Sequence, residues 1–286
     1  MYMYKLLDGR MVAEKIKDKI RRQVIELKKK NIILCLAVVL VGKDPASILY
    51  VSMKEKQAHE LGIKTKNIHL SKTISEGKLL DTIEKLNHQK DIQAILVQLP
   101  LPKHISTNKI IAAISPNKDV DGLHPENVGK LLLGEDTVIA PTAAGIMEIL
   151  KYYKISLTGK HVVIVGYGKL VGKPLAAMIG LSNQLATLTV CNHKTKNLAY
   201  YTNQADILVS ATGRANLIKK NMIKRGCVVV DAGTTRVGGK IVGDVDFENV
   251  KEKASYITPS KGGVGPMTVA MLLENVVTLI NYSCNV

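Results

Sequence analysis

The sequence predicts an α/β protein of two domains with a cleft between them, the second domain being a doubly wound parallel sheet. The first observation is that short apolar runs alternate with amphipathic patterns along most of the chain, as in parallel βαβ units. The second is a turn-rich break at residues 115–122, which separates two such runs. A chain of 286 residues, 46% of them hydrophobic, is long enough for two cores of ordinary size.

The first domain is predicted over residues 1–139. It begins with a charged amphipathic pattern, and the apolar run that follows indicates a buried strand. The helical pattern after Pro45 ends at Gly62, a residue that favours helix termination. Helices are therefore predicted over 12–29, 45–61, 75–86 and 107–113, and strands over 32–41, 64–70 and 92–97.

The second domain is predicted over residues 140–266. Helical patterns at 127–133 and 142–153 lie on either side of its start. Strands are expected over 161–165, 186–190, 207–210 and 227–230, and helices over 175–181, 197–201 and 217–224. A last helix over 267–281 is expected to return to the first domain, which residues 267–286 would then complete.

The chain is strongly basic, with a formal net charge of +16, and lysine-rich helix faces account for much of the excess. We interpret this charge as a solvated surface that also suits a small, multiply charged ligand such as a phosphorylated cofactor. No nucleic-acid partner is expected, because a chain without Trp and with a single Phe offers little for base stacking.

No apolar run reaches membrane-spanning length, and the N-terminus lacks the apolar region of a signal peptide, so no membrane partner is expected. The cysteines are far apart in the sequence and form no Cys-x-x-Cys pair; they are Cys35, Cys191, Cys227 and Cys284. This usage predicts reduced thiols in a cytoplasmic protein, and no metal site is predicted.

Tyr50 and Lys54 form the first candidate site. Both lie in the predicted helix that follows the first apolar strand, and residues four apart project from the same helix face. A phenol beside an amine can lower the pKa of the amine and relay protons, which makes the pair a candidate for acid–base chemistry. The alternative is a solvated helix face, on which both residue types are common.

A glycine-rich loop, Gly166-Tyr167-Gly168-Lys169-Leu170-Val171-Gly172, follows a predicted strand and leads into a helix. A dinucleotide-binding, Rossmann-like fold places its phosphates at such a loop, because glycines permit close approach and the helix N-terminus favours an anion. The spacing is one residue longer than the common fingerprint. The alternative is a tight turn without a ligand.

The next predicted strand is followed by His193 and Lys194. A site for NAD usually has an acidic residue there for the ribose hydroxyl, whereas a basic residue suits the 2′-phosphate of NADP. These residues favour NADP, with NAD as the alternative, unless they belong to an exposed loop with no ligand.

The order of these motifs separates two classes of dehydrogenase. Short-chain dehydrogenases also carry Tyr-x-x-x-Lys, but after the nucleotide loop, whereas Tyr50 and Lys54 precede it by more than a hundred residues. The chain instead resembles the bifunctional methylenetetrahydrofolate dehydrogenase/cyclohydrolase family over nearly its full length. The strings that carry the resemblance are at residues 41–47, 50–54, 97–102, 118–122, 172–174, 243–246 and 262–268.

The resemblance implies oxidation of 5,10-methylenetetrahydrofolate to the methenyl form with NADP, and hydrolysis of the methenyl form to 10-formyltetrahydrofolate. It also implies a homodimer. The implied catalytic residues are Lys54, Tyr50, Gln98 and Asp121. The implied folate-binding residues are Tyr50, Gln98, Leu99, Pro100, Asp121, Gly262 and Pro266. The implied cofactor-binding residues are Gly166, Tyr167, Gly168, Val171, Gly172, His193, Lys194 and Thr234.

Several strings depart from the family's pattern. The usual Gly-Arg-Ser of the nucleotide loop is replaced by Gly166-Tyr167-Gly168, and Lys194 or Lys169 could supply the missing positive charge. Further departures are at 140–143, 233–235 and 259–263. All lie where the cofactor or the domain junction is expected, so the dehydrogenase activity is the more vulnerable one. The alternative is therefore an enzyme with one activity only, or with NAD as its acceptor.

Overall fold

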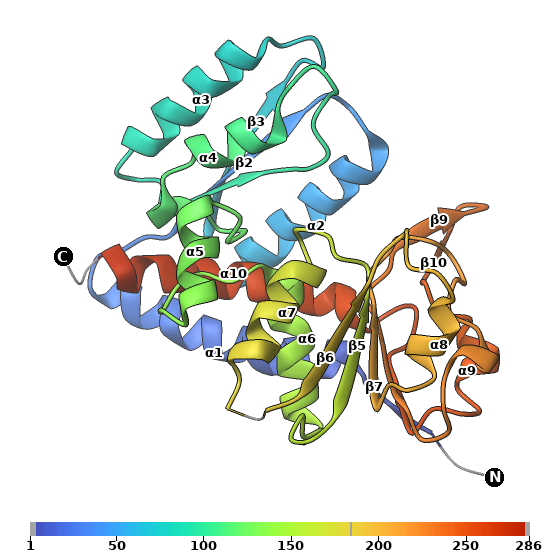
Figure 1. Cartoon of the computed structure of the whole chain (residues 1–286). Helices are drawn as coiled ribbons and strands as arrows, with labels where there is room; N and C mark the ends of the chain where they lie inside the picture. The colour runs from blue at the N-terminus through green and yellow to red at the C-terminus, as the bar shows by residue number, and fades with distance from the viewer. Residues whose placement is uncertain (1–3, 184, 284–286) are drawn as a thin grey trace. The chain divides into compact units, whose positions relative to one another are not determined.

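The computed structural model describes residues 4–183 and 185–283, and the chain divides into two compact units (Figure 1). The first unit combines the start of the chain up to Glu14 with Ala140–Met271, and the second combines Lys15–Ile139 with the chain from Leu272 onward. Two long helices, α1 (Gly9–Lys29) and α10 (Val264–Ser283), each continue from one unit into the other. In the described part of the chain, no helix has both the length and the apolar character needed to cross a membrane.

The second unit is built on a small parallel sheet with the strand order β3-β2-β4. The strands are β2 (Cys35–Val41), β3 (Lys64–Leu70) and β4 (Ala94–Val97). Helices α3 (Glu76–His88) and α4 (Thr107–Ala113) cover one face, opposite to α2 (Pro45–Glu60) (Figure 1). Leu79, Ile83 and Ile110 pack there against Val39 and Ile95. The apolar face of each helix thus packs against the side chains that alternate residues of the strands direct to the same side of the sheet.

Two shorter elements follow α4 in this unit. A single 3₁₀ turn, η1 (Pro116–Lys118), comes first, and α5 (Pro125–Leu133) follows it. Helix α5 ends at Gly134, whose φ of 75° is the left-handed conformation that commonly terminates helices.

The first unit contains a six-stranded sheet with the order β1-β11-β8-β7-β5-β6, in which every neighbouring pair is parallel. The strands are β1 (Lys5–Leu6), β5 (His161–Val165), β6 (Thr187–Cys191), β7 (Ile207–Ser210), β8 (Val228–Asp231) and β11 (Tyr256–Ile257). The chain moves outward from β5 in one direction to β6 and in the other to β7. Right-handed crossovers therefore place helices on both faces, which makes the sheet doubly wound.

Four helices accompany this sheet. Helices α6 (Pro141–Tyr152) and α7 (Gly172–Leu181) lie on one side, and α8 (Leu198–Thr202) and α9 (Phe247–Val250) on the other (Figure 1). Val163, Leu208 and Val229 form the core on the α8 side, together with Val250. An antiparallel hairpin of β9 (Thr235–Val237) and β10 (Lys240–Val242) turns at Gly238 and Gly239, both with positive φ, as tight hairpin turns require.

The structure differs from the sequence-based elements in several places, and the following three concern the first unit and its boundaries. The helix predicted over 217–224 is wrong: Ile218 forms a parallel bridge to Val245, and only the 3₁₀ turn η2 (Lys220–Met222) remains. Helix α7 begins at Gly172, before the predicted 175, because Pro174 lies in its first turn, where no N–H partner is lost. The chain up to Glu14 clusters with Ala140–Met271, because β1 pairs with β11.

Candidate active site

Lys54 and Tyr50 project from α2, one turn apart. Asp44 caps this helix by accepting hydrogen bonds from the N–H and the hydroxyl of Ser47, at 2.8 and 2.9 Å, and Pro45 occupies the first turn. The cap fixes where the helix begins and therefore which face carries the pair. Tyr50 is 38% exposed, whereas Lys54 is half-buried.

Gln98 meets Lys54 from the end of strand β4. The Nζ of Lys54 donates to Oε1 of Gln98 at 3.0 Å. The backbone N–H of Gln98 donates to the carbonyl of Val39 at 2.9 Å and so continues the sheet by one residue. Its Nε2 donates to the carbonyl of Leu99 at 2.7 Å. Both ends of the amide are occupied, so the side chain is held with its oxygen toward the amine.

Asp121 completes the cluster electrostatically. Burial lowers the pKa of the Lys54 ammonium, and the Asp121 carboxylate partly opposes that change. Burial also raises the pKa of Asp121 to about 6; the Lys54 cation opposes this increase, and the Asp119 carboxylate adds to it. An amine with a lowered pKa beside a carboxylate with a raised one is an arrangement suited to proton transfer near neutral pH.

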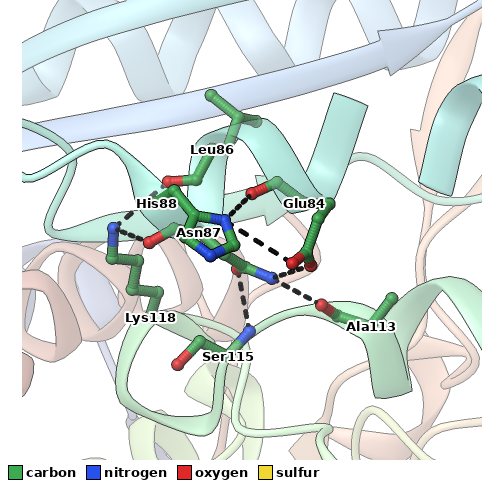
Figure 2. A network of polar contacts seen from close by, with 7 residues as sticks. All are labelled: Glu84, Leu86, Asn87, His88, Ala113, Ser115 and Lys118. Carbon is green, nitrogen blue, oxygen red and sulfur yellow. Dashed lines mark hydrogen bonds and ion pairs between the residues drawn. The ribbon is translucent and has the colours of Figure 1, made fainter. Parts of the chain in front are cut away.

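The loop that carries Asp121 is fastened to the end of α3 by Lys118. The Nζ of Lys118 donates to the carbonyls of Leu86, Asn87 and Gln89 at 3.1, 2.7 and 2.7 Å, and Figure 2 shows the first two of these contacts. The last carbonyls of a helix have no partner within it. Lys118 therefore satisfies the C-terminus of α3 and at the same time fixes the start of the loop.

The side chain of Asn87 holds the same loop from a second direction. Its Oδ1 accepts from the N–H of Ser115 at 2.9 Å, and its Nδ2 donates to the carbonyl of Ala113 at 2.8 Å (Figure 2). Asn87 thus ties the end of α4 to the end of α3.

Asp119 and Val120, the two residues directly before Asp121, are each held by hydrogen bonds to other segments. The buried Asp119 carboxylate accepts from the N–H of His124 at 2.7 Å and from Nδ2 of Asn127 at 3.0 Å. Asn275 donates to the carbonyl of Val120 at 2.9 Å. Of the four residues 118–121, three thus have structural partners of their own. Asp121 is the member whose charge raises the pKa of Lys54.

The glycine loop between β5 and α7 has two glycines that the backbone requires. Gly166 has a φ of 105°, and a Cβ there would lie 2.3 Å from the carbonyl oxygen of Ala211. A Cβ on Gly172 would lie 2.0 Å from the carbonyl oxygen of Gly166. Around Gly168, by contrast, no atom of the described residues lies within 4 Å of such a Cβ. The conformation therefore depends on the first and last glycines.

The loop also contains the exposed side chain of Tyr167 and leads into the N-terminus of α7. Tyr167 is exposed, with the Nζ of Lys173 lying 5.6 Å from its ring centroid, a cation–π arrangement. Val171 precedes α7 and supplies no side-chain cap. In the first turn of α7, the N–H groups of Lys173 and Leu175 donate to the carbonyls of Gly168 and Val171 at 3.0 and 2.9 Å, and Pro174 has no N–H.

The remaining predicted cofactor residues lie at loops of the same unit. His193 and Lys194 are exposed after β6, where Asn192 shapes the turn by accepting from the N–H of Lys194 at 2.9 Å. Thr234 is exposed after β8. All three follow the carboxyl ends of strands, the edge at which α/β sheets bind ligands.

Gly262 and Pro266 lie in the first unit, at the start of α10. Gly262 has a φ of 92°, and its carbonyl accepts from the N–H groups of Gly9 and Arg10 at 3.0 and 3.2 Å. The structure therefore groups Lys54, Gln98 and Asp121 in one unit and the glycine-loop residues in the other. Leu99 and Pro100 follow Gln98 directly, joined by a cis peptide bond.

Sequence reasoning missed the anchors of the Asp121 loop. Lys118 was part of a motif string without a role, and Asn87 carried no signal at all, because both act through contacts with segments about thirty residues away. Across residues 4–183 and 185–283, no group of three or more His, Cys, Asp and Glu is placed to hold a metal ion.

Fold and site together define an α/β enzyme with a lysine, glutamine and aspartate cluster in one unit and a dinucleotide-type glycine loop in the other. Residues 7–121 match the catalytic domain of tetrahydrofolate dehydrogenase/cyclohydrolase, and residues 140–284 match the NAD(P)-binding domain of the same enzymes. The chain belongs to the tetrahydrofolate dehydrogenase/cyclohydrolase family.

Individual relatives are similar over almost their whole length. The chain is 50% identical to the bifunctional protein FolD of Nautilia profundicola over 273 residues, which cover 95% of each chain. It is 49% identical to the solved bifunctional FolD of Campylobacter jejuni, with a TM-score of 0.95 and coverage of 98% and 99%. The Trypanosoma brucei enzyme, solved with NADP cofactor and inhibitor, is 35% identical, with a TM-score of 0.95 and full coverage of both chains.

The predicted family, the α/β fold class and the enzyme class are thereby confirmed, and the predicted combination of a nicotinamide cofactor with a folate substrate agrees with the two matched domains. The roles of individual residues stay predictions, which the geometry above makes specific.

Proposed function

We propose that the chain oxidises 5,10-methylenetetrahydrofolate to the methenyl form with NADP⁺ and hydrolyses the methenyl form to 10-formyltetrahydrofolate. The observation that carries this proposal is the cluster of Lys54, Gln98 and Asp121, in which an amine of lowered pKa is hydrogen-bonded to a neutral amide. Membership of the family supports both activities.

Lys54 acts as the proton carrier of the hydrolysis. Water adds to the methenyl carbon and loses one proton. The resulting hydroxyl loses its proton as the formyl carbonyl forms and the bond from that carbon to one nitrogen breaks, and that nitrogen gains a proton; one proton is released overall. A neutral amine accepts the first proton and, once charged, delivers one to the departing nitrogen. Burial lowers the pKa of Lys54 and so increases the fraction of neutral amine at physiological pH.

Gln98, Tyr50 and Asp121 orient the reactants. Gln98 holds the amine through its Oε1 without adding a negative charge. The exposed ring of Tyr50, one helix turn away, offers a flat surface for the folate. A carboxylate at Asp121 accepts hydrogen bonds from the amino and ring N–H groups of the pterin as a bidentate acceptor. We assign further folate contacts to Leu99, Pro100, Gly262 and Pro266.

The cofactor is assigned to the glycine loop of the first unit. NADP accepts the hydride that leaves the bridging carbon of the folate. Gly168, Val171 and Gly172 bring the backbone to its phosphates, and Tyr167 and Thr234 line the loop edges. Gly166, whose N–H donates to the carbonyl of Cys191 at 2.9 Å, permits the close approach of the cofactor to the loop. The exposed cationic Lys194, with His193, suits the 2′-phosphate of NADP better than the bare ribose of NAD.

An enzyme with hydrolysis alone is the second candidate, because the loop has lost the family's Arg and Ser. The geometry favours retention of both activities. The two glycines that close contacts require, Gly166 and Gly172, are present, and the two replaced positions are a solvent-exposed ring and a glycine with open space.

The site is tested by Lys54→Met, with Lys56→Met as the matched control from an exposed position on the same helix. We expect hydrolysis of methenyltetrahydrofolate, followed by its absorbance, to fall at least a hundredfold in the first variant and to stay unchanged in the second. A normal rate in Lys54→Met would exclude Lys54 as the proton carrier. Methenyl formation with NADP and with NAD, measured on the unmodified chain, separates the bifunctional enzyme from its alternatives.

We also propose a homodimer in the cytoplasm. The family resemblance supports the first statement, and the unpaired thiols of Cys35, Cys191 and Cys227 support the second. Sedimentation equilibrium on the purified chain tests the dimer, and a monomer at micromolar concentration would exclude it.

A further inference from the structure

Two buried carboxylates, Asp231 and Asp244, lie in the cofactor-binding unit and have no part in the chemistry described above. Asp244 is 0% exposed and Asp231 is 6% exposed. Buried carboxylates are costly unless their oxygens are hydrogen-bonded. The partners that satisfy them show which segments they hold together.

Asp244 holds the segment that follows strand β7. Its Oδ2 accepts from the hydroxyl of Ser210 at 2.9 Å, from the N–H of Thr212 at 2.6 Å and from the hydroxyl of Thr212 at 2.9 Å. Its Oδ1 accepts from the N–H of Arg214 at 2.9 Å. Four donors from five consecutive residues thus converge on one carboxylate, which fixes the backbone of residues 210–214.

Asp231 holds Asp244 in turn. Its Oδ1 accepts from the N–H of Asp244 at 3.0 Å and of Gly233 at 2.9 Å, and its Oδ2 accepts from the N–H of Val245 at 2.9 Å. The packing has no room for a further atom: a Cβ on Gly233 would lie 2.0 Å from Oδ1 of Asp244, and a Cβ on Gly243 would lie 2.0 Å from Oδ2 of Asp231.

The segment fixed by Asp244 supports the glycine loop. The N–H of Ala211 donates to the carbonyl of Val165 at 2.8 Å. The next residue, Gly166, lies so close to Ala211 that a Cβ there would come within 2.3 Å of the Ala211 oxygen. The first glycine of the loop therefore rests directly on the backbone that Asp244 holds.

We infer that Asp244 is a positioning residue for the nicotinamide cofactor, acting through residues 210–214 on the glycine loop, with Asp231 fixing Asp244. This inference rests on the proposed function, in which the glycine loop binds NADP. The Asp244 carboxylate touches no reacting atom. Its contribution is to keep the loop in the conformation that binds phosphate before the cofactor arrives.

The two activities supply an internal control. Hydrolysis of methenyltetrahydrofolate needs water but no nicotinamide cofactor, and Lys54, its proposed proton carrier, lies in the other unit. A residue that only positions the cofactor loop changes NADP affinity and leaves hydrolysis alone. A residue needed for folding in general lowers both.

The test is Asp244→Asn, in which an NH₂ group replaces one of the two acceptor oxygens and faces N–H donors. Asp246→Asn is the matched control, since Asp246 lies two residues away and its carboxylate accepts from Lys219 and Asn249 instead. We expect the Kd for NADP, measured by calorimetry, to rise at least tenfold in Asp244→Asn and less than twofold in Asp246→Asn. Hydrolysis of methenyltetrahydrofolate without NADP stays within twofold in both.

An NADP Kd within twofold of the unmodified chain would overturn the inference, and so would an equal loss of NADP binding and of hydrolysis. If Asp244→Asn does not fold, Ser210→Ala decides, because it removes one donor and leaves the carboxylate in place. A threefold or greater rise in the NADP Kd supports the inference, and a smaller change overturns it. An unmodified chain that hydrolyses methenyltetrahydrofolate but binds no NADP would instead overturn the proposed cofactor together with this inference.

Discussion

Lys54 donates its hydrogen bond to Gln98 at 3.0 Å, so the amine is held by a neutral acceptor while the Asp121 charge acts on it from nearby. A carboxylate in the place of the amide would stabilise the charged form of the amine. The neutral partner leaves burial as the dominant influence on the pKa of Lys54. The amine can then both accept a proton and release one during a single turnover.

The first prediction concerns this amide. We expect Gln98→Glu to raise the pKa of Lys54 and to move the pH–rate profile of hydrolysis toward alkaline pH by about one unit or more. Gln89→Glu is the control, because the side chain of Gln89 accepts from the exposed Lys66 at 2.8 Å, and the substitution creates a lysine–carboxylate pair that does not include Lys54. A pH profile that does not move in Gln98→Glu would show that the amide does not tune the amine.

The second prediction concerns Asp121, whose pKa is raised to about 6. Its carboxylate is ionised at neutral pH and becomes protonated as the pH falls through 6. We therefore expect the KM for folate to rise as the pH falls below 6, approaching about tenfold per pH unit. Asp121→Asn should bind folate weakly at every pH, with NADP affinity retained, and the exposed Asp136→Asn should behave as the unmodified chain. Equal losses of folate and NADP binding in Asp121→Asn would indicate a purely structural turn.

The third prediction concerns Lys118. Lys118→Met keeps the aliphatic stem but leaves three carbonyls at the end of α3 without their donor, which we expect to cost about 1–3 kcal/mol of unfolding free energy. The loop that carries Asp121 loosens as well, so the KM for folate rises. Lys85→Met, at an exposed position of α3, is the control for urea unfolding and for kinetics. If KM stays unchanged while stability falls, Lys118 supports the fold but not the site.

The fourth prediction separates the glycines of the nucleotide loop. Gly166→Ala places a Cβ 2.3 Å from the Ala211 oxygen in a left-handed conformation, so we expect a loss of about 1–3 kcal/mol in stability and of NADP binding. Gly168→Ala meets open space and should be tolerated in both respects. Calorimetric titration with NADP, together with thermal unfolding, checks the pair. Similar behaviour of the two variants would contradict the close contact at Gly166.

The fifth prediction concerns cofactor choice. Lys194→Glu places a negative charge where the 2′-phosphate is expected, so the KM for NADP should rise about fivefold to tenfold while that for NAD changes less than twofold. Lys196→Glu, also exposed and two residues further along, is the control. A parallel change for both cofactors would remove Lys194 from the phosphate site.

Much of the fold follows from local patterns. The strands at 161–165 and 207–210 agree with β5 and β7 at both ends, because each is a short apolar run bounded by turn residues. The strand at 64–70 also agrees with β3 at both ends, although its residues are largely polar. The two-residue strand β1 and the hairpin of β9 and β10 are too short and too exposed to have a pattern. The segment at 217–224 has helical periodicity, but its Ile218 is committed to a bridge with Val245, a contact that no local window contains.

The candidate site is predictable to a similar degree. Spacing alone places Tyr50 and Lys54 on one helix face. The approach of Gln98 to Lys54 joins residues 44 positions apart, and sequence comparison, not periodicity, pointed to it. Lys118, Asn87 and Asp244 remained without a role, because a side chain that fixes a distant backbone looks like any other polar residue until the chain is folded.

The pairing of β1 with β11 has a consequence for synthesis of the chain. Lys5 lies beside Tyr256, so the edge of the large sheet stays open until about 250 further residues have been translated, roughly 12–50 s at 5–20 residues per second. The other unit must likewise wait for the residues after Leu272. Neither unit is finished while the ribosome holds the C-terminus, and a gene cut between codons 139 and 140 would encode two fragments that each lack a piece of their own core.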